Sequence, residues 1–360
     1  MQTRSTALTT ILVLILGIES FSWTHPGTLD SRENLDFVKK QIAAKAEPWT
    51  GQLQSMISVE DLALPATPED MIDAHAGDNS RDNARRAYGN ALAWYLTGDE
   101  VYAKQAVAIL NAWSSLQGIQ STDQQKLLQA GWIGALFAPA ADIMLGYEQW
   151  SPAEIAKTRA MFRRVFYPLL NTASTWNGNV DLTQIVALMS IAVFNEDGEK
   201  FSRGLDRLKA RMPRYFYLPT DPTPDSTFWS NPTQWVAGLT QETCRDNNHH
   251  AQFALSAAIG AAEIAWHQGI DVYSTYQDRL IPTMELMALQ STSGNMQGIC
   301  KNNATSTDVY DTWEIAYNHY HNRKGIELPR TEEMIQQKVR LARCNSNSWN
   351  IFYETLTHGK

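Results

Sequence analysis

Two amide side chains lie just before one of the most apolar stretches of the chain. Trp176, Asn177 and Asn179 precede this stretch, with a glycine between the two amides. Backbone N–H groups and the helix dipole at the start of a helix favour an anion. The pattern therefore indicates a neutral donor site for an anionic group. Ordinary N-capping of the helix by Asn179 explains the same residues.

An arginine and two histidines form a second polar cluster, in residues 242–250, again just before a helical stretch. Arg245 and His249 share a helix face if the helix begins early enough. An arginine can hold a carboxylate in a forked pair, and a histidine can exchange a proton near neutral pH. His249 and His250 are adjacent and point in different directions, so we expect no metal and no cofactor. A capped helix with solvated charges is the alternative.

A third cluster, in residues 311–323, combines carboxyl, phenol and imidazole groups on one helix. Glu314, Tyr317 and His321 share a face that apolar residues do not dominate. The alternative is a helix at the edge of the core, with buried rings whose polar tips are hydrogen-bonded. Further candidates for the same site are Tyr310, Tyr320 and Arg323.

The sequence lacks the short signatures of several common enzyme classes. We find no nucleophile elbow, P-loop, dinucleotide-binding glycine motif or HExxH zinc motif. A glycosidase needs two carboxyl groups that face one cleft. The acids that could supply them are Asp181, Glu242, Asp246 and Glu314, so a hydrolase stays open.

Helical periodicity accounts for almost all of the ordered stretches, and alternating strand patterns are scarce. We expect helices at Arg32–Ala46, Asn83–Leu96, Val101–Trp113, Lys126–Leu145, Ser151–Leu170, Val180–Phe194, Gly198–Ala210, Asn248–His267, Val272–Leu289, Thr312–Arg323 and Thr331–Arg343. Long irregular stretches at 64–81, 217–243 and 290–311 are candidates for functional loops. The helix pairs show no strict repeat, which favours an all-α, closed or partly closed ring of hairpins over a solenoid. The loops of such a ring surround one central cleft.

Charge and targeting signals limit the partners. A net charge of −8 without a basic stripe argues against nucleic-acid binding. Residues 1–22 combine Arg4, the apolar run Thr9–Ile18 and small residues, as a secretory signal does, and the run is too short to span a bilayer. We therefore expect a secreted monomer that crosses no membrane, with one domain at residues 23–360. Among the cysteines, we expect a Cys300–Cys344 disulfide.

The order of several longer motifs resembles that of the secreted alginate-lyase-like polysaccharide lyases, and of polysaccharide lyase family 38 in particular. The motifs are HPG at 25–27, NALAWYLTGD at 90–99, AVAILNAW at 106–113, WNGN at 176–179, ETCRD at 242–246, EIAWHQGID at 263–271 and WEIAYNH at 313–319. Each motif is weakly specific, but their order and number cover nearly the whole chain after the signal.

The resemblance implies an α/α toroid that cleaves a 1,4-linked polyuronate, such as glucuronan or alginate, by β-elimination. This reaction needs a group that neutralises the substrate carboxylate, a base for the C5 proton and an acid for the leaving oxygen. Asn179 suits the neutralising role, and Arg245 and His249 suit the same pocket. Tyr317 suits the base or the acid. The expected substrate-binding residues are Trp176, Asn177, Tyr310, Tyr320, His321 and Arg323.

One departure from related lyases concerns the proton carrier. Those enzymes have a tyrosine shortly after the arginine, in the same helix, where this chain has Phe253. Phenylalanine cannot transfer a proton, so we expect Tyr317 to do so, with Tyr310 and Tyr320 as substitutes. The groups expected to surround Tyr317 and stabilise its phenolate are Arg245, Arg323 and His249.

The stereochemistry of the sugar limits the substrate. In glucuronate and mannuronate the C5 hydrogen and the leaving oxygen lie on the same side, so one tyrosine could serve both transfers. Guluronate needs two groups. We expect glucuronan or mannuronate-rich alginate, held by a local basic cluster of Arg245, Arg323, Arg81 and Arg85. The alternatives are a glycoside hydrolase on the same ring of helices and a secreted carbohydrate-binding protein without catalysis.

Overall fold

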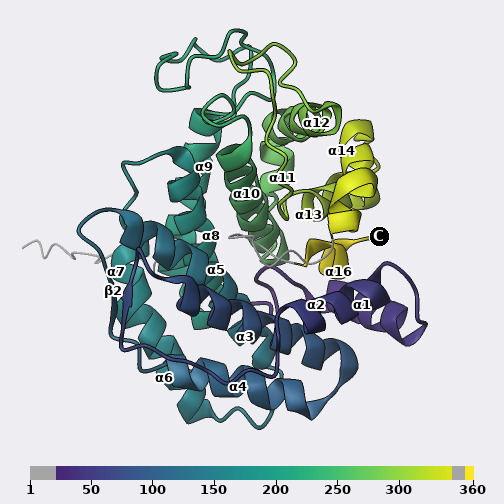
Figure 1. Ribbon diagram of the computed structural model, residues 1–360. Helices are drawn as coiled ribbons and strands as arrows, with labels where there is room; N and C mark the ends of the chain where they lie inside the picture. The colour runs from purple at the N-terminus through teal and green to yellow at the C-terminus, as the bar shows by residue number, and fades with distance from the viewer. Residues whose placement is uncertain (1–21, 343–352) are drawn as a thin grey trace, which may run out of the picture.

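The computed structural model describes residues 22–342 and 353–360 and is mostly helical (Figure 1). The α-helices are α1 (Arg32–Ala43), α2 (Trp49–Val59), α3 (Asp78–Thr97), α4 (Glu100–Trp113), α5 (Gln125–Met144), α6 (Pro152–Met161), α7 (Tyr167–Leu170), α8 (Gly178–Asn195), α9 (Gly198–Tyr215), α10 (His249–His267), α11 (Val272–Thr275), α12 (Gln277–Ser293), α13 (Glu314–Tyr317), α14 (Pro329–Met334), α15 (Arg340–Ala342) and α16 (Glu354–His358). Three π-helical segments are η1 (Phe162–Phe166), η2 (Asn318–Arg323) and η3 (Ile335–Val339). Two short strands, β1 (Met71–Asp73) and β2 (Gly118–Gln120), pair in parallel.

Four long helices, α3, α5, α8 and α10, form the inner layer of the molecule. Each inner helix packs along the next one in the order α3, α5, α8 and α10. Outer helices connect the end of one inner helix to the start of the next, as α4 does between α3 and α5 and α9 between α8 and α10 (Figure 1). Every residue of α8 is buried, and α5 is buried along nearly its whole length. These helices read as apolar on all sides because they contact other helices on all sides. The arrangement confirms the predicted all-α ring of helical hairpins, an α/α toroid.

The inner helices start on the same face of the molecule. Near the start of α3, Arg81 donates a hydrogen bond of 2.9 Å to Gln129 in the first turns of α5. Near the starts of α5 and α8, a Cβ added to Gly131 would lie 2.8 Å from the Thr183 methyl group, so these two helices touch where glycine permits it. The N-terminal ends of the inner helices therefore gather on one side, which we call the N-face.

The inner helices end together on the opposite side, which we call the C-face. The rings of Trp94, at the end of α3, and Tyr147, just after α5, lie 5.4 Å apart. His25 from the N-terminal segment contacts Asp142 at the end of α5 and lies 3.8 Å from Glu196, which follows α8. The helices α3, α5 and α8 thus run parallel, and their length separates the two faces.

Local sequence signals place several helix ends correctly. Asp99 is the N-cap of α4, Gly98 ends α3 with a φ of 77°, and Ser151 with Glu154 forms the capping box of α6. Other expectations need correction. The helices expected at 151–170, 272–289, 312–323 and 331–343 are each divided into shorter segments, and α3 begins before residue 83. The expected end of the last of these, Arg343, lies outside the described residues.

Two inner helices also satisfy the length and composition of a membrane span. The 18-residue apolar windows of α5 and α8 are 100% buried inside the protein. Their apolar character is thus explained by packing against other helices. The expectation of a protein that crosses no membrane stays a prediction, because length and composition alone do not distinguish such core helices from membrane spans.

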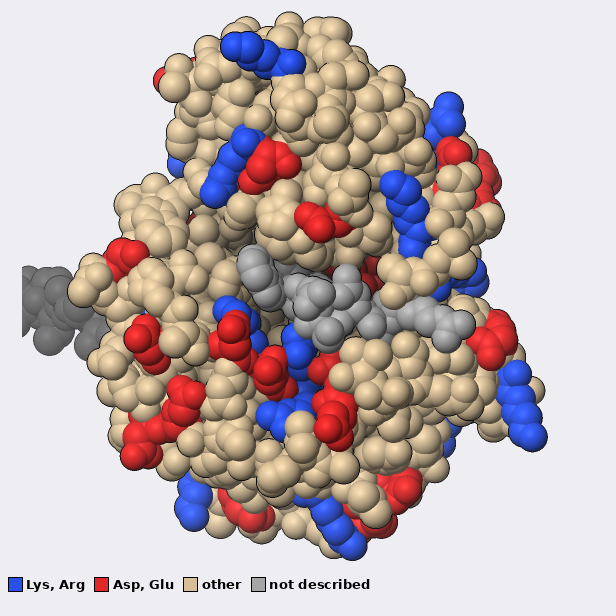
Figure 2. Space-filling view, viewed as in Figure 1, with Lys and Arg blue, Asp and Glu red and all other residues tan. Residues whose placement is uncertain are grey.

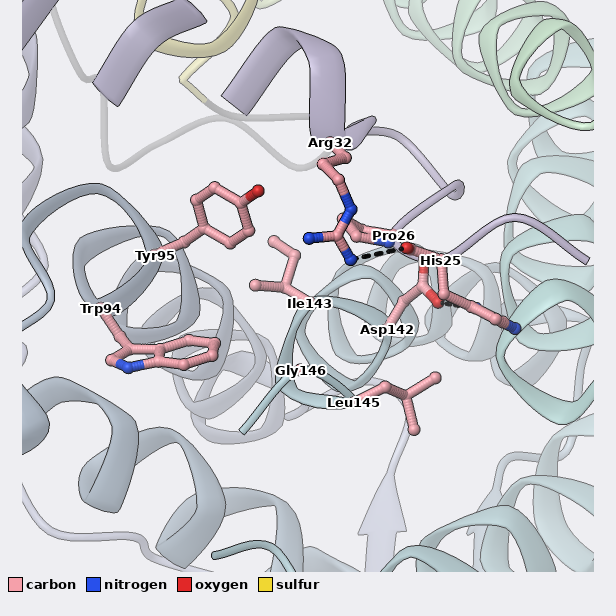
Figure 3. A pocket seen from close by; sticks show the side chains of 9 residues that line it. All are labelled: His25, Pro26, Arg32, Trp94, Tyr95, Asp142, Ile143, Leu145 and Gly146. Atoms are coloured by element: carbon pink, nitrogen blue, oxygen red, sulfur yellow. Dashed lines mark hydrogen bonds and ion pairs between the residues drawn. The ribbon is translucent and has the colours of Figure 1, made fainter. Parts of the chain in front are cut away.

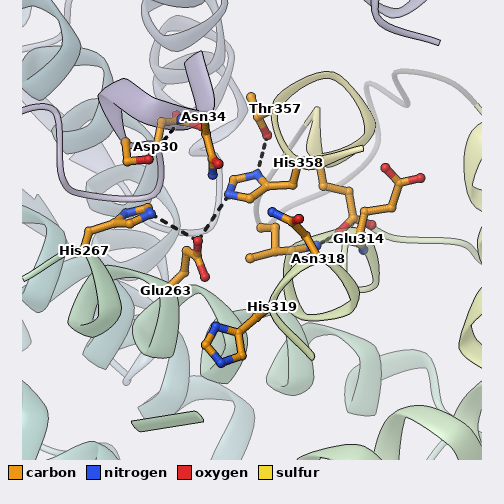
Figure 4. Close-up of polar contacts among 12 residues, drawn as sticks. Asp30, Asn34, Glu263, His267, Glu314, Asn318, His319, Thr357 and His358 are labelled. Atoms are coloured by element: carbon orange, nitrogen blue, oxygen red, sulfur yellow. Dashed lines mark hydrogen bonds and ion pairs between the residues drawn. The ribbon is translucent and has the colours of Figure 1, made fainter. Parts of the chain in front are cut away.

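A buried carboxylate joins the two ends of the described chain near the C-face. Glu263 on α10 is 0% exposed and receives two hydrogen bonds from Arg323, the shorter of 2.7 Å. His267 and His358 lie 3.1 Å and 3.7 Å from the same carboxylate oxygen (Figure 4). Tyr273 donates to the other oxygen at 2.9 Å. A buried charge is tolerated when it is paired and hydrogen-bonded in this way.

The ionisation of this cluster is set by its own members. Burial raises the pKa of Glu263, but the charge and hydrogen bond of His267, with Arg323, hold it well below its usual value. Burial lowers the pKa of His267, and the Glu263 carboxylate raises it further than burial lowers it. His267 also contacts the carbonyl of Thr28 at 2.8 Å, which fixes the N-terminal segment to α10.

Glu263→Gln should destabilise the fold by about 3 kcal/mol, because breaking a buried pair leaves other polar groups unpaired. The lowered pKa of Glu263 means that its contribution is complete above pH 4.5 and is lost as the pH falls through that lowered value. The raised pKa of His267 means that its contribution is complete below pH 6.5 and is lost as the pH rises through the raised value. Urea unfolding should therefore show the largest loss between these two limits.

The control for this prediction is Glu199→Gln, which removes an exposed carboxylate paired with Lys200. Exposed pairs contribute little, so this variant should unfold at the same urea concentration as the wild type. Equal stability of the Glu199 and Glu263 variants at pH 5.5 would show that the buried cluster does not hold the chain ends.

Candidate active site

The start of α8 is held close to α9 by a glycine. Asn177 occupies the N-cap position without a side-chain capping bond, and the helix begins at Gly178. A Cβ on residue 178 would lie 2.2 Å from the ring of Tyr215, so no larger residue fits without movement. Trp176 is 38% exposed and Asn177 is half-buried, so both face the N-face solvent. The alternative that Asn179 caps the helix is wrong, because Asn179 lies inside α8.

The side chain of Asn179 instead binds a buried carboxylate. Its amide nitrogen lies 2.7 Å and 2.9 Å from the two oxygens of Glu242, and its backbone N–H donates to the same group at 3.1 Å. Tyr215 donates to Glu242 at 2.8 Å and Arg245 at 2.6 Å. Glu242 is only 2% exposed, so these bonds replace its hydration. The cluster joins the start of α8, the end of α9 and the turn before α10.

Arg245 carries this network to the protein surface. Its side chain is 37% exposed, and only one of its nitrogens contacts Glu242 at a hydrogen-bonding distance. A second nitrogen lies 3.8 Å from Asp246, whose other close partner is the ring of His250. A guanidinium has five N–H donors, so Arg245 keeps donors for a carboxylate in solvent while Glu242 fixes its position.

His249, the first residue of α10, lies between an acid and a phenol. Its Nδ1 is 2.7 Å from the Asp308 carboxylate and 3.1 Å from the Tyr310 hydroxyl. The ring of Phe253 packs against both His249, at 5.1 Å, and Tyr310, at 4.5 Å. An imidazole, a carboxylate and a phenol in contact form a group that can transfer protons. Phe253, which cannot carry a proton itself, orients the two rings that can.

The ionisation of the acid and the phenol follows from these contacts. Burial raises the pKa of Asp308, but hydrogen bonds from His249 and Ser306 hold it below its usual value. Burial, followed by the Asp308 charge, raises the pKa of Tyr310 above its usual value. Asp308 is therefore ionised and Tyr310 protonated at neutral pH.

The tyrosine expected to carry the proton lies elsewhere. The ring of Tyr317 stacks on His321 at 4.8 Å. Burial, and the charges of Glu332 and Glu327, raise the pKa of Tyr317. Carboxylates disfavour a phenolate, and the nearby cation is Arg340 rather than the expected Arg245, Arg323 or His249.

Two other expected binding residues are also turned away from His249. Arg323 pairs with Glu263, which lies roughly 20 Å farther along α10 at 1.5 Å per residue. The hydroxyl of Tyr320 donates to the backbone carbonyl of Tyr273 at 3.1 Å. The structure therefore brings together Arg245, His249 and Tyr310, and it separates them from His321, Arg323, Tyr317 and Tyr320. The alternative of a core-edge helix describes 312–323 better in that Tyr320 is buried and its hydroxyl is bonded, although the buried Nε2 of His319 has no hydrogen-bond partner.

Positive and negative side chains alternate on the surface near the N-face. Arg81 stacks on Trp132 at 5.0 Å, and Arg85 contacts the buried carboxylate of Glu60 at 3.2 Å. Figure 2 shows Lys and Arg interspersed with Asp and Glu over the described part of the face in view. A polyanion must therefore be attracted by individual cations rather than by a broad field. Among the described residues, no group of three or more metal-ligating side chains is present.

A disulfide bridges the two loops that carry the site. Cys244, next to Arg245, is bonded to Cys300 in the loop that leads to Asp308 and Tyr310. The expected Cys300–Cys344 pairing is therefore wrong, and Cys344 lies outside the described residues. A second link between the loops is the hydrogen bond from Ser306 N–H to the Asn247 carbonyl at 2.9 Å.

Replacing both bridged cysteines by serine should lower the free energy of unfolding by about 4 kcal/mol, because the bridge closes a loop with a sequence separation of 56 residues. Turnover of any substrate should fall with stability, since His249 and Tyr310 then lie on loops that are no longer tied together. Thermal unfolding with and without dithiothreitol checks this. Wild-type protein should be sensitive to the reductant and the double variant insensitive, and equal unfolding of the two proteins would contradict the prediction.

Two residues of the cluster had no sequence signal for their roles. In the sequence, Glu242 stands out only as a carboxyl group that a hydrolase could use, and Asp308 belongs to no candidate cluster. They contact Asn179 and His249 across separations of 63 and 59 residues. The spacing from Asp246 to His250, four residues along α10, could have indicated their ion pair.

The sequence and the fold are both similar to those of known alginate lyases. Residues 66–216 match the profile of the alginate lyase family. No curated protein matches the sequence. Alginate lyase A1-III from Sphingomonas species A1 superposes with a TM-score of 0.69 at 13% identity, over 93% of this chain and 96% of that enzyme.

Two further structures agree on the fold. A tetrasaccharide complex of an A1-III variant gives a TM-score of 0.66 at 14% identity, over 93% of this chain and 96% of that chain. An alginate lyase from Bacteroides ovatus gives 0.57 at 14% identity, over 74% and 84% of the two chains. The structural matches establish the α/α-toroid fold, and the family match covers the segment from β1 to α9. The chain is therefore similar to the alginate lyases in residues 66–216 and in its overall fold.

Proposed function

We propose that the protein is a secreted lyase that cleaves a 1,4-linked polyuronate by β-elimination at the N-face. The observation that carries this proposal is the contact of His249 with both Asp308 and Tyr310, beside an exposed arginine held by Glu242. A base, an acid and a carboxylate-binding cation are the three groups that the elimination needs. The alginate named for the structural neighbours supports a uronate as the sugar.

Neutralisation of the substrate carboxylate falls to Arg245 and Asn177. Arg245 is exposed and fixed in position by Glu242, and Asn177 lies half-buried at the start of α8 without a capping bond. The helix dipole at that start also favours an anion, although the N–H groups of Gly178 and Asn179 are already bonded to Gln241 and Glu242. Asn179 is 4% exposed and its amide is bonded to Glu242, so it acts by positioning Arg245 rather than by touching the sugar.

Proton transfer is divided between His249 and Tyr310. When Asp308 accepts the Nδ1 proton of His249, the other ring nitrogen keeps its lone pair and can remove the C5 proton. Tyr310 is protonated and can donate to the leaving glycosidic oxygen, after which the C4–O4 bond is broken and a C4–C5 double bond is formed. Two separate groups serve sugars in which the transfers occur on the same side or on opposite sides. We therefore propose mannuronate-rich alginate or glucuronan as substrate, with polyguluronate also tested.

Export is supported by the disulfide between Cys244 and Cys300, since such bonds persist in oxidising compartments. The expected secretory signal, residues 1–22, lies almost wholly outside the described residues. Secretion and a monomeric state stay predictions for the mature protein.

The proposed reaction is tested by incubating purified protein with polymannuronate, polyguluronate, glucuronan and hyaluronan and following ultraviolet absorbance. A lyase leaves an unsaturated uronate that absorbs, and we expect this signal with polymannuronate or glucuronan. New reducing ends without absorbance would indicate a hydrolase, and binding without either product would indicate a carbohydrate-binding protein.

Tyr310→Phe should lower kcat at least a hundredfold, because it removes the acid and keeps the ring that packs on Phe253. Tyr317→Phe is the matched control, since it also removes one phenol hydroxyl, and it should keep turnover within about twofold. Steady-state kinetics on the best polymer checks both variants. If only the Tyr317 variant lost activity, Tyr317 in residues 312–323 would be the proton carrier and the assignment to Tyr310 would be wrong.

Asn177→Ala and Asn179→Ala should both lower turnover, but only Asn179→Ala should also lower stability. Asn177→Ala should lower turnover on the order of a hundredfold with unchanged unfolding, as loss of one donor to a developing charge does. Asn179→Ala should in addition lower the unfolding free energy by about 2 kcal/mol, because it leaves Glu242 buried with fewer partners. Kinetics and urea unfolding of both variants separate the roles, and full activity of Asn177→Ala would remove it from the neutralising site.

A further inference from the structure

The C-face, opposite the proposed active site, has three adjoining hollows that share one arginine. Arg32, the first residue of α1, lines cavities of about 180, 300 and 290 Å³. They lie beside the ends of α3, α5 and α10, because Trp94, Asp142 and Trp266 line one or more of them. At 1.5 Å per residue, the nineteen residues of α10 separate these hollows from His249 by roughly 28 Å. This surface has no part in the chemistry described above.

Aromatic rings form one side of the first two hollows. Trp94 and Tyr95 lie side by side on α3 and are only half-buried, and Arg32 lies across the hollow from them (Figure 3). The two rings are T-shaped to each other, with centroids 6.3 Å apart. The hydroxyl of Tyr95 is held by Asp36 at 2.8 Å, which fixes the ring. Rigid, partly exposed aromatic rings offer apolar area to a sugar ring at a low cost in conformational entropy.

Positive groups lie along the same line of hollows. Arg32 is exposed, and among the described residues no carboxylate lies within ion-pair distance of it; its one hydrogen bond, of 3.5 Å, reaches the His25 carbonyl. Lys39 lies 5.7 Å from the centre of the Tyr95 ring. At the other end, Lys324 lies 5.2 Å from the centre of the Trp266 ring, but it is paired with Asp271 at 3.5 Å. The hollows are therefore lined by aromatic rings, and Arg32 and Lys39 are the lining cations that can receive an anion.

The acids of this surface are mostly engaged. Asp142 is 0% exposed and accepts hydrogen bonds from Gly27 N–H and Thr28 N–H, at 2.8 Å and 3.0 Å. Asp36 binds the Tyr95 hydroxyl, as described above. Glu33 lines the third hollow, where Arg323 faces it. Among the described residues, Arg32 and Lys39 have no carboxylate within ion-pair distance, and Arg32 lines all three hollows.

We propose that these hollows are a second, non-catalytic binding site for an acidic oligosaccharide, with a sugar carboxylate on Arg32 and sugar rings against Trp94 and Tyr95. The nature of the sugar rests on the proposed function, since the polymer cut at the N-face supplies the ligand. A polymer bound at the C-face is kept near the active site and raises its effective concentration there. A short oligosaccharide cannot reach both faces at once, so only the polymer is held near the active site by binding at the C-face.

The test titrates full-length protein carrying Tyr310→Phe with saturated hexamannuronate and hexaglucuronate by calorimetry, with an uncharged mannohexaose as the charge control. We expect two binding events for one acidic hexamer. Arg32→Gln should weaken one of them at least tenfold. Lys39→Gln should weaken the same event, and it replaces Arg32→Gln if that variant does not fold. Lys104→Gln removes an equal charge from exposed α4 and should leave both events unchanged.

Kinetics distinguishes this inference from the proposed function. In the active protein, Arg32→Gln should raise the apparent KM for the polymer several-fold and leave cleavage of the hexamer unchanged. Binding at Arg32 in a protein without lyase activity would refute the proposed function and keep this site. Lyase activity with identical binding and polymer KM in the Arg32, Lys39 and Lys104 variants would refute this site alone, as would equal binding of the uncharged hexaose.

Discussion

The buried carboxylate of Glu242 is the interaction on which the proposed site depends. A carboxylate that is only 2% exposed must find partners in the protein. Its partners are Asn179 in α8, Tyr215 in α9 and Arg245 before α10. The position of the exposed guanidinium therefore depends on the closure of the ring between α8 and α10. Because Gly178 allows Tyr215 to approach the start of α8, even a methyl group there would disturb the arrangement.

The parallel inner helices give the two faces different chemistry. The N-terminal ends of the inner helices, whose dipoles favour negative charge, meet at the N-face, and at the start of α8 the N–H of Asn179 binds the Glu242 carboxylate. At the C-face the helix ends are covered by the N-terminal segment, which Asp142 and His267 hold in place. The buried Glu263 cluster brings α10, η2 and α16 together at that level, so the chain ends stabilise the ring far from the chemistry.

The sequence predicts the helical ring well because its signals are local. The N-cap Asp99, the left-handed Gly98 and the capping box at Ser151 each act within a few residues. The site is less predictable because its contacts span long separations, as Glu242 to Asn179 does. Helical spacing could not show whether the polar face of 312–323 meets His249 or the core, and the structure places Tyr317 on His321. The choice of Tyr310 follows only from how the loop of residues 294–313 returns to α10.

The central claim is that His249, Tyr310 and Arg245 perform an elimination without water. The most direct test is to digest the polymer that gives ultraviolet absorbance in water enriched in ¹⁸O and to weigh the new chain ends by mass spectrometry. Elimination adds no water, so the account predicts unsaturated ends without ¹⁸O, at a rate that falls at least a hundredfold in Tyr310→Phe. Saturated chain ends, with products that together are heavier by one water molecule than elimination products, would show hydrolysis and contradict the account.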